Sequence, residues 1–174
     1  MRLQEFAPHV PALRHEKELM GSVFGGPGFL GTNATFRPDL ALVLILISSS
    51  LFTIGWRLAV HKHYRIHRWV QTTAAFLNAV VVLTSMVSSF ITYILPGIPA
   101  KLTEGSYGVT TVHALVGAIG LLLGVFVDLR GNGLVPKGLR FKDYKLFMRT
   151  SYALYMLATL GGIVVYIVVY VFGK

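Results

Sequence analysis

The chain has 174 residues, of which 54% are hydrophobic and only 13% are charged, and its mean hydropathy is +0.65. Soluble domains usually contain about a quarter charged residues, so this composition excludes a soluble enzyme and a disordered chain. It indicates an integral membrane protein. The absence of cysteine excludes disulfides, iron–sulfur clusters and thiolate ligands, so any metal site would use His and oxygen ligands. Although the net charge is +9, we expect no nucleic-acid partner, because the basic residues flank apolar stretches, as they do in membrane proteins.

The N-terminal segment, residues 1–37, differs from the rest of the chain. It contains Pro8, Pro11 and Pro27, a GGPGFLG run and a short amphipathic piece near LRHEKELM. The order of basic, apolar and small residues that defines a cleavable signal peptide is missing. We therefore expect residues 1–37 to form an external segment that lies along the membrane surface.

Four apolar stretches in residues 38–174 are each long enough to cross a bilayer as a helix, which takes about 20 residues. They run approximately over residues 38–60, 69–95, 107–129 and 147–172. The connectors between them are short, so consecutive helices should be antiparallel. The sequence therefore predicts an all-α fold, an integral membrane antiparallel four-helix bundle surrounded by lipid.

Charge predicts the orientation of this bundle. The first and third connectors with their flanks hold ten basic and two acidic residues, a net charge of +8, whereas the other side of the bundle has six basic and five acidic residues, or +1. Because positive residues stay on the cytoplasmic side, both termini and the second connector should lie outside. We expect the protein to be a multi-pass protein of the bacterial cytoplasmic membrane.

Three of the predicted spans carry one stripe of small or polar residues at helical spacing, which is the face expected to contact neighbouring helices. The stripes are Gln71, Asn78, Ser85, Ser89 and Thr92 in the second span, His113, Gly117, Gly120, Gly124 and Asp128 in the third, and Tyr152, Tyr155, Thr159, Gly162, Tyr166 and Tyr170 in the fourth; the first span has only Ser48, Ser49, Ser50 and Thr53. Helix packing explains most of these positions. For Asn78 and His113 a functional role is an equal alternative, because polar groups in lipid are costly.

Histidines provide the candidate metal ligands. His63 and His67 would share one helical face if the second helix began near His63, a spacing that lets two imidazoles bind one metal ion. The alternative is that they lie at the headgroup level without a ligand. His67 and His113 should be roughly 20 Å apart along the membrane normal, too far for one haem. A haem or copper site could instead combine His113 with a His of the N-terminal segment, His9 or His15.

A second candidate site lies in the outer half of the predicted bundle. Asp39, His113, Tyr166 and Tyr170 should occupy similar depths by residue count, and they are the candidates for binding a cofactor. A buried imidazole needs a hydrogen-bond partner, which Asp39 or a tyrosine hydroxyl could supply. A carboxylate there would fix the ring's tautomer and raise its basicity, as a metal ligand or proton acceptor requires. A clamp that only holds three helices together is the alternative. We expect no enzyme activity, since no catalytic motif occurs.

Four segments of the chain together resemble a known family. They are PGFLGTNATFRPDLALVLIL, HYRIHRWVQ, VHALVG and MRTSYALYMLATLGGIVVYIVVY. They are similar to the small four-span bacterial membrane proteins of the YozB/CtaM-like family, which are associated with the maturation of haem-copper terminal oxidases. The positions that match are Gly31, Asp39, His67, Arg68, His113 and the Tyr and Gly residues of the last span. The third connector departs from the family pattern, because Lys142, Asp143, Tyr144 and Lys145 stand where a His-Arg pair is expected.

The resemblance implies an accessory or assembly protein of a respiratory terminal oxidase that binds other membrane protein subunits and transiently handles copper or haem. Two alternatives remain open from the residues. One is a haem-bearing or quinol-contacting electron-transfer subunit that uses His113 and the tyrosines of the last span. The other is a purely structural subunit of a larger complex.

Overall fold

The computed structural model describes residues 25–139 and 143–173, and within these ranges every extended regular element is a helix. The helices are α2 (Phe36–Val60), α3 (Tyr64–Val81), α4 (Val87–Ser89), α5 (Gly105–Gly131) and α6 (Tyr144–Tyr166). Two π-helical turns (Val82–Met86 and Phe90–Ile94) and a 3-10 turn (Leu95–Gly97) join α3 and α4 into one long span, and a π-helical turn (Ile167–Val171) extends α6. A 3-10 turn at Lys137–Leu139 lies between α5 and α6.

Four of these helical segments, Phe36–Val60, Tyr64–Gly97, Gly105–Gly131 and Tyr144–Val171, are long and apolar enough to cross a membrane. The prediction of an all-α bundle with four membrane spans is thereby confirmed. The helices extend slightly beyond the predicted stretches, most clearly where α3 begins at Tyr64 rather than at Trp69. The basic residues there are polar but not helix-breaking, so the helix continues past the edge of the apolar stretch.

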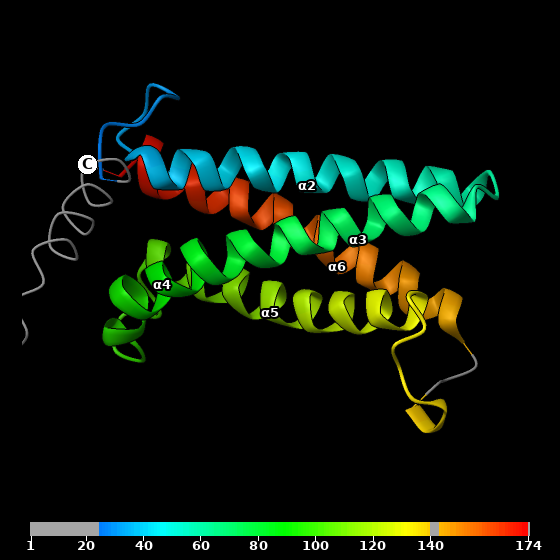
Figure 1. Ribbon diagram of the computed structural model, residues 1–174. Helices are drawn as coiled ribbons and strands as arrows, with labels where there is room; N and C mark the ends of the chain where they lie inside the picture. Colours follow the sequence, from blue (N-terminus) through cyan, green and yellow to red (C-terminus); the bar gives the residue numbers. More distant parts are fainter. Residues whose placement is uncertain (1–24, 140–142, 174) are drawn as a thin grey trace, which may run out of the picture.

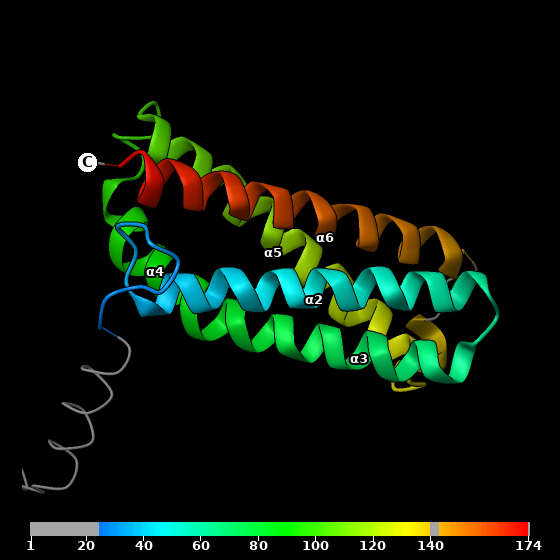
Figure 2. The ribbon, with the colours of Figure 1, turned by 90° about the horizontal axis from the view of Figure 1, so that it is seen from above.

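The helices form an antiparallel bundle in which α2 packs against α3 and α6, while α5 packs against α3 and α6 (Figures 1 and 2). The helices α2 and α5 therefore lie on a diagonal. At one end of the bundle, the hairpin end, lie the turn between α2 and α3 and the connector between α5 and α6 (Figure 1). At the other, the loop end, lie residues 25–35, the connector between α3 and α5 and the end of α6.

The interior is built from small and polar side chains together with a few large ones. Two buried clusters hold the helices together, one of Ala41, Ile45 and Val81 and the other of Phe52, Ala74 and Tyr155. The Ser48 hydroxyl donates a hydrogen bond of 2.8 Å to the Ala74 carbonyl, so α2 and α3 approach closely there. Large apolar side chains, such as Phe76 and Leu122, point outward and suit contact with lipid.

The predicted inward stripes are confirmed on α6, where Tyr155, Thr159 and Tyr166 are buried. On the second span the stripe is correct at Asn78, which is buried, and wrong at Thr92, which is exposed. The physical reason is the pair of π-helical turns, since each one adds a residue and rotates the following residues by roughly 100° around the helix axis.

The described part of the N-terminal segment, residues 25–35, folds over the loop end of the bundle (Figure 2). An isolated bridge pairs Pro27 with Thr35. The Phe36 amide donates to the Gly26 carbonyl at 2.9 Å, and the Gly28 amide donates to the Ala34 carbonyl at 3.1 Å. The amphipathic piece near LRHEKELM, His9 and His15 lie outside the described residues. The expectation that this segment follows the membrane surface therefore stays a prediction.

Candidate functional site

The most completely bonded polar group of the described residues is the Asp39 carboxylate, in the first turn of α2. Its side chain is fully buried, at 0% exposure. One oxygen, Oδ2, accepts hydrogen bonds from the backbone amides of Phe29 and Leu30, both at 2.7 Å. The other oxygen, Oδ1, accepts a hydrogen bond of 2.5 Å from the Tyr166 hydroxyl of α6. Three donors and no acceptor suit the ionised form, and they join the N-terminal loop, α2 and α6.

A chain of hydroxyl groups continues this arrangement, and its direction can be deduced. The Tyr166 oxygen lies 2.7 Å from Thr32 Oγ1, which also accepts the Ala34 amide at 3.3 Å. Because Tyr166 gives its one proton to Asp39, the Thr32 hydroxyl must donate to Tyr166. Donation therefore runs from Ala34 through Thr32 and Tyr166 to Asp39, and successive hydrogen bonds of one direction strengthen one another.

Two glycines make this loop possible. A Cβ at Gly28 would lie 2.5 Å from both the Ala34 carbonyl oxygen and Asp39 Oδ2, closer than real Cβ atoms come. Gly31 has φ +72, in the left-handed region that favours glycine. Between them, the Phe29 and Leu30 side chains are 51% and 42% exposed, and the Phe29 ring contacts the Phe36 ring with centroids 5.6 Å apart. We call residues 26–35, together with the Asp39 and Tyr166 side chains that hold them, the cap.

Tyr170 also belongs to the cap region. Its ring packs against the Tyr166 ring with centroids 5.2 Å apart, and its carbonyl accepts the Asn33 amide at 3.1 Å. The Asn33 side-chain amide donates to the Gly173 carbonyl at 3.4 Å. The cap therefore ties the loop to the last turns of the fourth span, and the predicted proximity of Asp39, Tyr166 and Tyr170 is correct.

The expected hydrogen bond between His113 and the cap is not formed. Instead, the His113 ring lies against the backbone of α6 beside Gly161 and Gly162 and faces the Ala158 carbonyl, although Nδ1 makes no hydrogen bond of good geometry. The reason is the diagonal placement of α2 and α5, which leaves α6 between His113 and Asp39. The glycine pair lets α5 approach α6 at this level, so the ring fills the space that a side chain would take.

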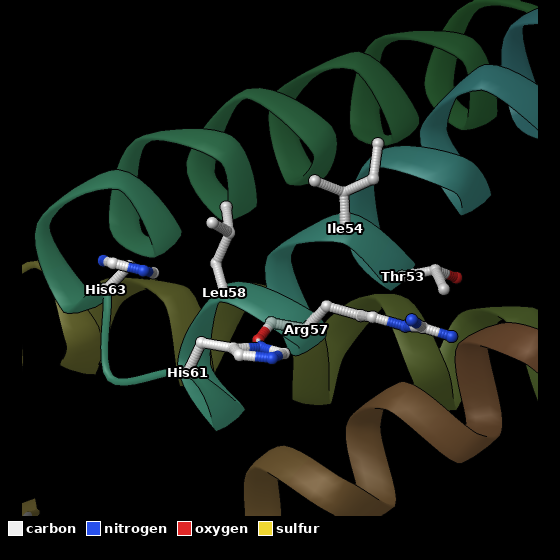
Figure 3. A pocket seen from close by; sticks show the side chains of 6 residues that line it. All are labelled: Thr53, Ile54, Arg57, Leu58, His61 and His63. Atoms are coloured by element: carbon white, nitrogen blue, oxygen red, sulfur yellow. Dashed lines mark hydrogen bonds between the residues drawn. The ribbon is translucent and has the colours of Figure 1, made fainter.

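The metal candidates do not come together. The His67 ring faces α2, where its Nδ1 donates to the Gly55 carbonyl at 2.7 Å. His63 lies at the turn, on the wall of a groove that also contains His61 (Figure 3). Across residues 25–139 and 143–173, no three His, Asp or Glu side chains form a group that could hold one metal ion. A haem or copper role for His63, His67 or His113 stays a prediction.

Two further polar clusters lie deeper in the bundle. At mid-bundle the Tyr155 hydroxyl donates to Asn78 Oδ1 at 3.1 Å, beside a small cavity of about 20 Å³. That volume suits about one water molecule. The buried Gln71 Oε1 and the Ser151 side chain line the same cavity, and Gln71 Oε1 has no partner among the described residues. Asn78 therefore links α3 to α6 through Tyr155, which fits the helix-packing alternative; its functional alternative stays a prediction.

Sequence reasoning missed the cluster near the hairpin end. Thr72 Oγ1 donates to Asp128 Oδ1 at 3.1 Å, and the Asn132 side-chain amide donates to Thr72 Oγ1 at 2.9 Å and to the Asp128 carbonyl at 3.0 Å. The signal that could have found it was the single acidic residue at the end of the third span, since a carboxylate at that depth requires a donor on the neighbouring helix.

Comparison of the chain with protein-family models, with curated proteins and with solved structures finds no match. The resemblance to the YozB/CtaM-like family therefore stays a prediction.

Proposed function

We propose that this chain is an accessory or assembly protein of a respiratory haem-copper terminal oxidase in the bacterial cytoplasmic membrane. It would act by binding partner subunits, with the loop end outside and the hairpin end in the cytoplasm. The oxidase is suggested by the four segments that resemble the YozB/CtaM-like family. The orientation is suggested by the excess of basic residues at the hairpin end.

The observation that carries a partner-binding function is the way Asp39 fixes the cap. The carboxylate holds the backbone of Phe29 and Leu30 while their side chains remain exposed. A rigid loop that displays two large apolar side chains loses little conformational entropy on binding, which favours a docking element. The loop also contacts the bundle's last span, so the docking element is part of the membrane domain.

The test is deletion of the gene followed by complementation. We expect the deletion strain to lose terminal oxidase activity and oxidase haem, and the wild-type gene to restore both. The double variant Phe29→Ala, Leu30→Ala should accumulate normally in the membrane without restoring activity. The matched control is Leu157→Ala, Leu160→Ala, two exposed residues of α6, which should complement fully. A deletion strain with unchanged oxidase activity and haem content would refute the proposal.

The alternative, a haem-bearing or quinol-contacting subunit, is favoured by one observation. The His113 Nδ1 is buried without a hydrogen bond of good geometry, and its ring lies against Gly161 and Gly162 of α6. The absorption spectrum separates the assembly protein from the haem-bearing subunit, because purified protein that carried haem would show a Soret band in at least one redox state. We expect no such band from the assembly protein purified without its partners.

A further inference from the structure

An open groove of about 490 Å³ lies at the hairpin end of α2. Its wall is formed by Thr53, Ile54, Arg57, Leu58, His61 and His63 (Figure 3). Ile54 and Leu58 make one part apolar, whereas Arg57 and the two histidines make the other part basic. Because α2 ends at Val60, the groove lies where a membrane-spanning helix leaves the hydrocarbon and meets the headgroups.

The charge on Arg57 has no counterpart within the described chain. Its guanidinium makes no hydrogen bond and no ion pair there, and the sequence holds no acidic residue from Leu40 to Thr103. The side chain runs back along α2 toward Thr53, as long side chains on helices do (Figure 3). The cation is therefore directed toward the membrane side of the groove. A charge at that depth requires a partner or an aqueous surface.

The other polar groups of the groove show which atoms remain for a ligand. The His61 ring donates from Nδ1 to the Arg57 carbonyl at 2.8 Å, which fixes the ring beside the arginine and leaves Nε2 as its remaining hydrogen-bonding atom. The Thr53 hydroxyl already donates to the Ser49 carbonyl at 3.0 Å and lies 3.1 Å from the Tyr152 hydroxyl. Recognition would therefore depend on Arg57 and His61.

We propose that this groove binds an anionic phospholipid. The phosphate would contact the Arg57 guanidinium, which presents donors in a planar fork that matches phosphate oxygens. In the tautomer that donates from Nδ1, His61 Nε2 is an acceptor, so it would accept a hydrogen bond from a headgroup hydroxyl; the first part of an acyl chain would lie along Ile54 and Leu58. The groove volume falls within the roughly 300 to 1,000 Å³ of small-ligand sites. Basic pockets at the ends of membrane helices suit lipid headgroups for the same reasons.

The native tryptophan beside the groove provides the measurement. Trp56 precedes Arg57, and its ring stacks on Tyr152 with centroids 5.9 Å apart. The variant Trp69→Phe leaves Trp56 as the single tryptophan. This protein is reconstituted in phosphatidylcholine vesicles that contain either brominated phosphatidylglycerol or brominated phosphatidylcholine, and quenching of Trp56 reports how strongly each lipid is preferred. We expect a preference of about fivefold for phosphatidylglycerol, the size associated with one basic residue at an anionic surface.

The matched pair of variants separates this site from diffuse charge. Arg57→Gln should abolish the preference for phosphatidylglycerol over phosphatidylcholine. Arg65→Gln, which removes the same charge from an exposed position outside the groove, should preserve it. Arg57→Lys, which keeps the charge but loses the fork, should retain part of the preference and serves if Arg57→Gln fails to fold. Equal quenching by the two lipids, or equal losses in Arg57→Gln and Arg65→Gln, would overturn the proposal. Equal quenching would instead favour an acidic side chain of a partner subunit as the ligand of Arg57.

Discussion

Two charged residues at opposite ends of α2, Asp39 and Arg57, lie in opposite environments. At the loop end, Asp39 is completely buried and accepts three hydrogen bonds from the protein itself. At the hairpin end, Arg57 is exposed and has no partner within the described chain. The buried Asp39 carboxylate loses its hydration, but its hydrogen bonds to the protein fix the local structure. The unpaired Arg57 guanidinium at the membrane boundary can instead form its strongest interactions with another molecule.

The difference shows what each charge is used for: Asp39 stabilises the fold, as Asp128 does near the hairpin end, whereas Arg57 remains for contacts with another molecule. The cap uses its carboxylate to hold a loop, and the contacts that the loop offers outward are apolar, through Phe29 and Leu30. The hairpin end offers basic contacts beside an apolar wall. A chain with two such different surfaces at opposite ends of one bundle can bind different classes of molecule at each.

The largest expected effect is on the cap. The substitution Asp39→Ala removes an acceptor from two backbone amides and from the Tyr166 hydroxyl. Since each buried donor without a partner costs about 1 to 3 kcal/mol, we expect a loss of roughly 3 kcal/mol or more in unfolding free energy. The measurement is the melting temperature of the purified protein in detergent, with protease cleavage of residues 26–35 as a local readout. The melting temperature of Asp39→Asn, which keeps one acceptor oxygen, should lie between those of the wild-type protein and Asp39→Ala. An unchanged melting temperature for Asp39→Ala would show that the cap is not fixed by this carboxylate.

Gly28→Ala tests the same cap through its backbone. The added Cβ would lie 2.5 Å from the Ala34 carbonyl and from Asp39 Oδ2, and neither atom can move without breaking a hydrogen bond. Forcing extra volume into such a site costs about 1 to 3 kcal/mol, so melting should occur at a clearly lower temperature. The control is Gly138→Ala at the hairpin end, where a Cβ meets nothing within 4 Å and the melting temperature should not change. Equal changes in melting temperature for Gly28→Ala and Gly138→Ala would contradict the close packing of the cap around Gly28.

Much of the fold could be predicted from sequence, because length and apolarity alone define membrane spans. Residue count along each helix also placed Asp39, Tyr166 and Tyr170 at one level. The depth of a residue in the membrane, however, does not determine which helices are neighbours. The predicted hydrogen bond between His113 and the cap is not formed because α2 and α5 lie on a diagonal. The loop amides that bond Asp39 could not be predicted either, since they depend on a backbone path set by two glycines and not on side-chain type.

The contact between α5 and α6 provides a smaller test. Gly161→Ala would place a Cβ 3.1 Å from His113 Nδ1, so the ring or the helix must shift. We expect a loss of about 1 kcal/mol in the wild-type background and a smaller loss in the His113→Ala background, where the ring is gone. Equal costs of Gly161→Ala in both backgrounds, measured by melting in detergent, would show that the ring does not fill this space.

The smallest expected effect is at the hairpin end. In a neutral detergent without phospholipid, Arg57→Gln should change the unfolding free energy by no more than about 0.5 kcal/mol, the range for surface residues without partners. The reason is that the Arg57 guanidinium makes no bond within the described chain, so its removal takes no bond from the folded state. The aliphatic part of its side chain still covers part of the groove wall. Phosphatidylglycerol added to the detergent should raise the melting temperature of the wild-type protein more than that of Arg57→Gln, because a ligand that binds only the folded protein stabilises it. A loss above about 1 kcal/mol in the lipid-free protein would mean that Arg57 has an internal role. In that case the charges at the two ends would both serve folding, and the groove would have no unpaired cation to offer a lipid.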